Sequence, residues 1–130
     1  MNLENQVTSL ELSKQLRELG VKQESLFWWN TWGNKLGNPF VTHTKGGWAK
    51  DMTPYLVSAF TVAELGEMLP FFVNKDHVWA GQLMCVRHPH DWMVSYGTMK
   101  EAWIKESADT EADARAKMLI HLIKEKIITP

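Results

Sequence analysis

The stretch Phe60–Leu65, with the sequence FTVAEL, carries a complete signal for the start of a helix. The Thr61 hydroxyl can accept a hydrogen bond from the backbone amide of Glu64, and the Glu64 side chain can accept one from Thr61 in return. Phe60 and Leu65 occupy the positions of a hydrophobic staple, which fixes the direction from which the chain enters the helix. We therefore predict a short helix that starts at this point.

An extended segment is expected to lead into this short helix. Val57–Phe60 enters it, and Pro70 ends it because proline cannot continue a helix. Further upstream, Ser25–Trp29 is short, aromatic and bounded by polar residues, which is typical of a strand. Both faces of this strand are apolar. It is therefore either covered on both sides or has one side left as a binding platform.

A β-hairpin is the clearest prediction downstream of the short helix. Gln82–Arg87 and Trp92–Tyr96 are its two arms, and His88–Asp91 supplies the proline and aspartate that favour a turn. Upstream, glycine and proline recur at short spacing over residues 31–54. This pattern indicates turns between two brief strands, Phe40–His43 and Gly47–Ala49.

A helix is expected near the N-terminal end, over Ser9–Leu19. Thr8 and Glu11 have the spacing of a capping box, and Gly20 stands where a helix often ends in a left-handed residue. An apolar stripe at helical spacing connects the two ends and consists of Leu12, Leu16 and Leu19.

A second long helix is expected over Thr110–Lys126. Thr110 can cap it, and Glu111 and Arg115 form an i, i+4 pair. Its apolar stripe comprises Ala112, Ala116, Met118, Leu119, Leu122 and Ile123. The order of elements predicts an α+β fold, in which residues 1–130 form one domain with an antiparallel sheet packed against two longer helices and one short helix.

Composition limits the classes of function. The chain has 130 residues, 45% of them hydrophobic and 22% charged, and a net charge of −1, so it does not favour double-stranded nucleic acid as a partner. No apolar run approaches the length of a membrane span, and the N-terminus lacks the pattern of a signal peptide. The single cysteine, Cys85, cannot form an internal disulfide. We therefore expect a cytoplasmic protein with no membrane partner.

Three blocks of the sequence, at residues 9–29, 58–70 and 109–123, read SLELSKQLRELGVKQESLFWW, SAFTVAELGEMLP and DTEADARAKMLIHLI. Together they resemble a family of small, uncharacterised proteins encoded by bacteriophages and prophages. The resemblance implies a small α+β protein in the cytoplasm of a host cell, but it implies no reaction. Small phage accessory proteins often act on host defence, by blocking a host protein or by sequestering a signalling nucleotide, which is an analogy of origin alone.

The region Ser25–Lys50 has an unusual composition. It contains four of the seven tryptophans of the chain and three lysines, without any acidic residue. Aromatic rings stack on bases and lysines neutralise phosphates, so this mixture suits a nucleotide or a single strand. The candidate ligand-binding residues here and on the hairpin are Trp28, Trp29, Trp32, Lys35, His43, Lys45, Trp48, Lys50, Arg87 and Tyr96.

Two other interpretations of this region remain open. The tryptophans can belong to the core, with the lysines on the solvent face, or they can form a protein interface, where tryptophan and arginine often dominate the binding energy. The protein-interface interpretation expects an exposed aromatic patch and no concave pocket of phosphate size.

The remaining candidates point to no chemistry. His88, His90 and Asp91 lie in a turn without the partners that a metal site requires, and Cys85 lies in an apolar strand, where a core role is favoured. No catalytic residue, metal or cofactor is assigned, and we expect a protein that is not an enzyme. The favoured function is a small phage-type accessory protein that binds a nucleotide-like host defence signal. The alternative is a protein–protein interaction module that blocks a host protein, and a homodimer is possible.

Overall fold

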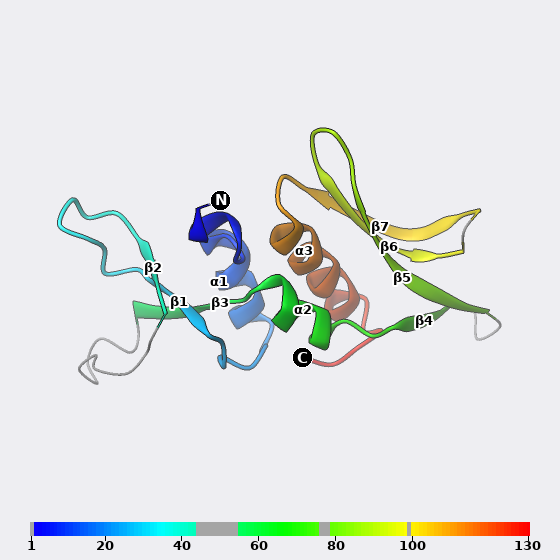
Figure 1. The fold of residues 1–130 in the computed structure, drawn as a ribbon. Helices are drawn as coiled ribbons and strands as arrows, with labels where there is room; N and C mark the ends of the chain where they lie inside the picture. Colours follow the sequence, from blue (N-terminus) through cyan, green and yellow to red (C-terminus); the bar gives the residue numbers. More distant parts are fainter. Residues whose placement is uncertain (1, 44–54, 76–78, 99) are drawn as a thin grey trace.

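The computed structural model describes residues 2–43, 55–75, 79–98 and 100–130 (Figure 1). Two antiparallel sheets, of three and four strands, lie on opposite sides of the helices. The predicted α+β class is confirmed, but the strands form two sheets in place of the one expected.

The three-stranded sheet contains the first strand that the sequence predicts. Its strands are β1 (Phe27–Asn30), β2 (Phe40–Thr42) and β3 (Leu56–Ala59), in the order β2-β1-β3. Trp28 and Trp29 point to opposite faces of β1, and both are buried. This strand is therefore covered on both sides. The predicted strand Gly47–Ala49 lies outside the described residues.

The four-stranded sheet is a meander whose strands pair in sequence order. It consists of β4 (Phe72–Lys75), β5 (Trp79–Arg87), β6 (Trp92–Gly97) and β7 (Ala102–Ala108). The predicted hairpin is confirmed as β5 and β6, with Cys85 opposite Val94. Strands β4 and β7 were not predicted.

Three α-helices and a short 3-10 helix complete the fold. These are η1 (Leu3–Asn5), α1 (Leu10–Glu18), α2 (Val62–Met68) and α3 (Glu111–Lys124). Both bonds of the predicted capping box of α2 are present, 3.2 Å from the Glu64 amide to Thr61 Oγ1 and 3.0 Å from the Thr61 amide to Glu64 Oε1. The prediction from local sequence is therefore confirmed at this helix.

The predicted cap of α1 is wrong by one residue. The N-cap is Ser9, whose side chain accepts from the amide of Leu12, in place of Thr8. Thr8 is fully buried, and its hydroxyl accepts from the amide of Phe60 at 3.0 Å and contacts Ser13 Oγ at 2.6 Å. The hydroxyl therefore joins α1 to the segment before α2 and does not cap the helix.

The main core lies between the helices and the four-stranded sheet. Helix α3 packs on β6 and β7, and α1 and α2 pack against α3 (Figure 1). The largest of its fully buried side chains are Leu16, Phe60, Leu65, Tyr96, Met118 and Leu122. A smaller core of Val7, Trp29, Val57 and Ala59 lies against the three-stranded sheet. Burying each large apolar side chain contributes roughly 1.5–3 kcal/mol, so the main core dominates stability.

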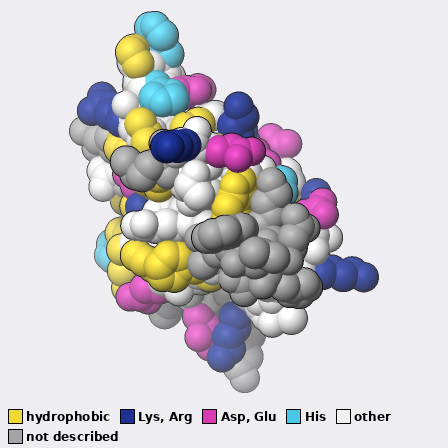
Figure 2. Space-filling model, turned by 90° about the vertical axis from the view of Figure 1, so that its right-hand side faces the viewer, with side chains coloured by type: hydrophobic (Ala, Val, Ile, Leu, Met, Phe, Trp, Pro, Cys, Tyr) yellow, Lys and Arg dark blue, Asp and Glu magenta, His cyan; other side chains and the backbone are white. Residues whose placement is uncertain are grey.

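The face of the four-stranded sheet that lies away from α3 points outward. Figure 2 views the molecule from this side, and hydrophobic, basic and acidic side chains are mixed among the described residues there. Phe72 on β4 and Val86 on β5 remain 52% and 41% exposed. The described part of this surface is therefore mixed in character.

Candidate functional site

The two tryptophans at the centre of the predicted ligand site belong to the interior. Trp28 and Trp29 are only 6% and 8% exposed. The indole Nε1 of Trp29 donates to the carbonyl of Thr8 at 2.8 Å, which satisfies its polar group inside the protein. In this structure neither ring has a free face for a ligand, as the core interpretation of these residues expected.

Tyr96 is also interior, in the other sheet. Its ring is fully buried in the main core, and its hydroxyl donates to the carbonyl of Pro70 at 2.6 Å. Burial raises the pKa of the phenol above its ordinary value of 10.0. Tyr96 therefore anchors β6 to the segment before β4 and presents no surface to a ligand.

The other described members of the predicted site are exposed but separated. Trp32 is 61% exposed and contacts Tyr55 edge to face, with ring centroids 4.9 Å apart. Lys35 and His43 are exposed in the same region, whereas Arg87 is exposed at the end of β5, in the other sheet. Three further members, Lys45, Trp48 and Lys50, lie outside the described residues. The described members therefore do not form one site.

The hairpin residues show no sign of reactive chemistry. His88 Nδ1 lies 3.2 Å from Asp91 Oδ1, which closes the turn. Cys85 packs against the main core, and burial raises the pKa of its thiol, so the thiolate is disfavoured. Within the described ranges, no group of three or more potential ligand side chains could hold a metal ion.

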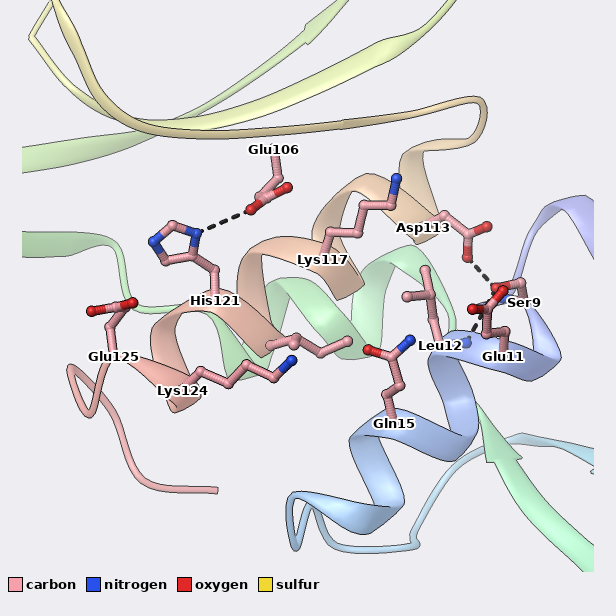
Figure 3. A pocket seen from close by; sticks show the side chains of 11 residues that line it. Ser9, Glu11, Leu12, Gln15, Glu106, Asp113, Lys117, His121, Lys124 and Glu125 are labelled. Carbon is pink, nitrogen blue, oxygen red and sulfur yellow. Dashed lines mark hydrogen bonds and ion pairs between the residues drawn. The ribbon is translucent and has the colours of Figure 1, made fainter.

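A polar cavity of about 570 Å³ lies between α1 and α3 (Figure 3). His121 Nδ1 lies 3.0 Å from Glu106 Oε1, which links α3 to β7. At the other end, Asp113 accepts a 2.8 Å hydrogen bond from the amide of Ser9, which links α3 to the start of α1. Lys117 donates to the carbonyl of Ser107 at 2.9 Å.

These bonds assign a mainly structural role to the α1–α3 cavity. A histidine oriented by a carboxylate is also found in general-base sites. Here, however, the histidine, the half-buried aspartate and one lysine are already paired with other elements of the fold. The network therefore fixes how α1 and β7 sit against α3.

The half-buried carboxyl group of Asp113 in this network makes stability depend on pH. Burial raises the pKa of Asp113 in the folded protein, although the hydrogen bond from Ser9 opposes this shift. The folded state then holds the proton more tightly than the unfolded state. The contribution of this group to stability is therefore complete below the unfolded pKa and is lost as the pH rises through the folded pKa.

We predict that Asp113→Asn gains stability relative to the wild type as the pH is raised from about 4 to about 7. The amide oxygen of asparagine keeps the acceptor for Ser9 but carries no charge at any pH. Urea denaturation at a series of pH values measures this difference, and the exposed carboxylate variant Glu101→Gln is the control. If the difference in unfolding free energy between Asp113→Asn and the wild type does not change with pH, the pH-dependent role of Asp113 is wrong.

A second cavity, of about 550 Å³, is more apolar and is called the aromatic cavity here. Phe27, which packs against the smaller core, and Trp92, which packs against the main core, both line it. Residues of η1 and the first turns of α2 and α3 complete the lining: Leu3, Asn5, Gln6, Thr61, Val62, Ala63, Asp109, Thr110, Glu111 and Ala112. The aromatic cavity therefore lies between the smaller core, beside the three-stranded sheet, and the main core, beside the four-stranded sheet.

Two acidic residues line the aromatic cavity, and they differ in whether their carboxylates form an ion pair. Glu111 Oε1 accepts from Arg115 Nη2 at 2.9 Å and Nε at 3.1 Å. Asp109, in contrast, forms no hydrogen bond or ion pair through its carboxylate within the described part of the chain. The Arg87 guanidinium lies 5.9 Å from the centre of the Trp92 ring. An unpaired carboxylate and two aromatic rings thus border one cavity.

Sequence reasoning missed the aromatic cavity. Asp109 and Thr110 stand at a recognisable helix start, but Phe27 and Trp92 come from different sheets, and their meeting depends on the packing of those sheets. A pairing of this kind leaves no local pattern in the sequence.

None of the helices in the described ranges is long and apolar enough to span a membrane. Comparison of the chain with protein-family models, with curated proteins and with solved structures gives no match.

Proposed function

We propose that the protein acts by binding, and that the aromatic cavity receives a small planar ligand of the nucleotide-like class. The observation that carries this proposal is the presence of Phe27 and Trp92 in one cavity of about 550 Å³. Small-molecule sites usually measure roughly 300–1,000 Å³ and combine an apolar lining with a few polar groups. The aromatic cavity has this character, since polar groups occur among mostly apolar walls.

The chemistry of the lining favours stacking as the main source of affinity. A flat ring against an aromatic side chain gains roughly 1–3 kcal/mol per base, and every base has such a face. Sequestration of a ligand requires no catalytic group. This role also suits a small accessory protein of the phage type, which the three resembling sequence blocks suggest.

The test is a tryptophan fluorescence titration with nucleosides and nucleotides. We expect saturable quenching by at least one of them, and a dissociation constant about tenfold higher in Phe27→Leu and in Trp92→Leu, because each change removes a stacking surface. Phe72→Leu, on the outward face of the four-stranded sheet, is the matched control and is expected to bind as the wild type does. Circular dichroism confirms that each variant is folded.

Two outcomes would contradict the proposal. One is a flat response of the wild type across the whole panel. The other is unchanged binding in folded Phe27→Leu and Trp92→Leu proteins, which would place the ligand elsewhere.

A second candidate function rests on the exposed cluster of Trp32, Leu36 and Tyr55. Leu36 is 85% exposed, and the edge-to-face contact of Trp32 with Tyr55 holds a large ring at the surface. Tryptophan and tyrosine are enriched where protein interfaces concentrate their binding energy. A flat nucleotide titration, together with a host protein captured by the wild type and lost in Trp32→Ala, would favour this interface. Self-association through the same cluster stays a prediction.

A further inference from the structure

Strand β4 forms one edge of the four-stranded sheet, and its main contacts within the described residues are with β5 (Figure 1). The amide of Leu83 donates to the carbonyl of Phe71 at 2.9 Å, so the backbone groups of Phe71 and Val73 face β5. In an antiparallel pair the intervening residues face the other way. The backbone N–H and C=O groups of Phe72 and Asn74 therefore point away from β5, along the open edge.

The open edge is apolar and is held in place by the core. Val73 is buried in the main core, and Tyr96 donates to the carbonyl of Pro70 at 2.6 Å just before the strand. Phe71 and Phe72 are 60% and 52% exposed, and their rings meet edge to face with centroids 4.6 Å apart. Pairing of another strand with this edge therefore requires little further ordering of β4.

The opposite edge of the same sheet is protected. Helix α3 packs on β7, where Lys117 donates to the carbonyl of Ser107 at 2.9 Å and His121 pairs with Glu106. Proteins usually protect edge strands with charged side chains or a covering element, because a bare edge pairs with another chain. Strand β4 carries a single charged residue, Lys75, at its end. The contrast between the two edges indicates that β4 is a site for strand pairing.

We propose that β4 pairs antiparallel with β4 of a second copy of this chain, with the two-fold axis at Val73. In this register Phe72 of each copy lies opposite Asn74 of the other, and the outward backbone groups of each such pair exchange hydrogen bonds. A two-fold contact of this kind is self-complementary, so it closes as a dimer without further copies. The inference is independent of the aromatic cavity and of the exposed tryptophan cluster.

The distribution of charge favours a second copy in this register. Lys75 of each copy lies opposite Phe71 of the other, and an aromatic face attracts a cation. The two lysines lie at opposite ends of the paired strands, so like charges do not meet. A four-residue strand offers a smaller interface than the roughly 1,200–2,000 Å² of stable complexes. The dimer is therefore expected to be weak, with a dissociation constant on the order of 100 μM.

Sedimentation velocity of the purified protein from about 10 μM to about 1 mM tests the dimer. The dimer fraction of the wild type is expected to rise over this range. Asn74→Pro removes an outward N–H, a change that edge strands tolerate, and is expected to stay monomeric. The matched control Asn74→Ala keeps that N–H and is expected to dimerise as the wild type does. Trp32→Ala is also expected to dimerise, because the exposed cluster is not the interface.

Two variants at one position test the register. Phe71→Glu and Phe71→Lys both remove the same ring, but the first sets an opposite charge against Lys75 of the other copy and the second sets a like charge. The dissociation constant is expected to be about tenfold higher in Phe71→Lys than in Phe71→Glu. High salt is expected to reduce this ratio, because exposed charges are screened.

The outcomes that would overturn the inference are distinct. A wild type that remains monomeric up to about 1 mM excludes the dimer. A dimer that persists in folded Asn74→Pro, or that is lost in Trp32→Ala, places the interface elsewhere. Equal dissociation constants in the two Phe71 variants show that the register is wrong, and this pair decides the matter if Asn74→Pro does not fold. None of these results bears on nucleotide binding, which the fluorescence titration tests separately.

Discussion

Replacing Phe60 with alanine is expected to lower the free energy of unfolding by about 4 kcal/mol, within the range of roughly 3–5 kcal/mol for a buried phenylalanine. The ring is 0% exposed and belongs to the main core, beside the segment that leads into α2. Its removal loses apolar burial and leaves a cavity among closely packed neighbours. Urea denaturation followed by circular dichroism measures the loss.

Phe72→Ala is the matched control for this experiment. The chemical change is the same, but the Phe72 ring is 52% exposed, so the loss is expected to stay below about 1 kcal/mol. A loss at Phe60 as small as that at Phe72 would mean that the main core does not include this ring.

Replacing Gly97 with alanine is expected to lower the free energy of unfolding by about 3 kcal/mol, because the added methyl group overpacks the backbone around it. A Cβ atom at this position would collide with the carbonyl oxygen of Glu101 and would lie 2.9 Å from the Cα atom of Ala102. These are backbone atoms at the irregular junction of β6 and β7, so they cannot move aside without changing the strand pairing. Urea denaturation of the purified variant measures the loss.

Gly66→Ala is the control for the effect of adding a methyl group. Gly66 lies within α2, and its Cβ atom would meet only the flexible end of the Arg115 side chain, at 3.0 Å. Alanine also favours a helix over glycine by roughly 1 kcal/mol, so this variant is expected to be neutral or slightly stabilised. Equal stability of the two variants would show that the β6–β7 junction tolerates a side chain.

The elements that the sequence predicted are those whose signals are local. The capping box of α2, the β5–β6 hairpin and the apolar stripe of α3 each depend on residues a few positions apart. Strand β7 lacks such a signal, because Lys105, Glu106 and Ser107 interrupt any apolar alternation. Its extended form depends on pairing with β6, which a pattern within the segment cannot reveal.

The same distinction explains the displaced cap of α1. Thr8 and Glu11 have the spacing of a capping box, but the partner that Thr8 takes is Phe60, which is distant in the sequence. For a buried hydroxyl, a bond to an otherwise unpaired interior amide outweighs a cap that Ser9 can supply.

The candidate site was harder to predict than the fold. An aromatic composition identified Trp28 and Trp29 as unusual, but it could not distinguish a ring that packs inside from one that faces a ligand. The rings that do border a cavity, Phe27 and Trp92, were unremarkable in their own segments. A binding surface assembled from two sheets becomes visible only when those sheets are placed together.

The sequential pairing of the four-stranded sheet bears on the order in which the chain folds. Strands β4 to β7 each pair with their neighbour in the chain, and α3 follows at once and packs on β6 and β7. Contacts between nearby segments close short loops and cost little chain entropy, so this half is expected to form early. The bond between Ser9 and Asp113 spans almost the whole chain and is expected to form late. The aromatic cavity, bordered by both halves, would then be completed only in the last step of folding.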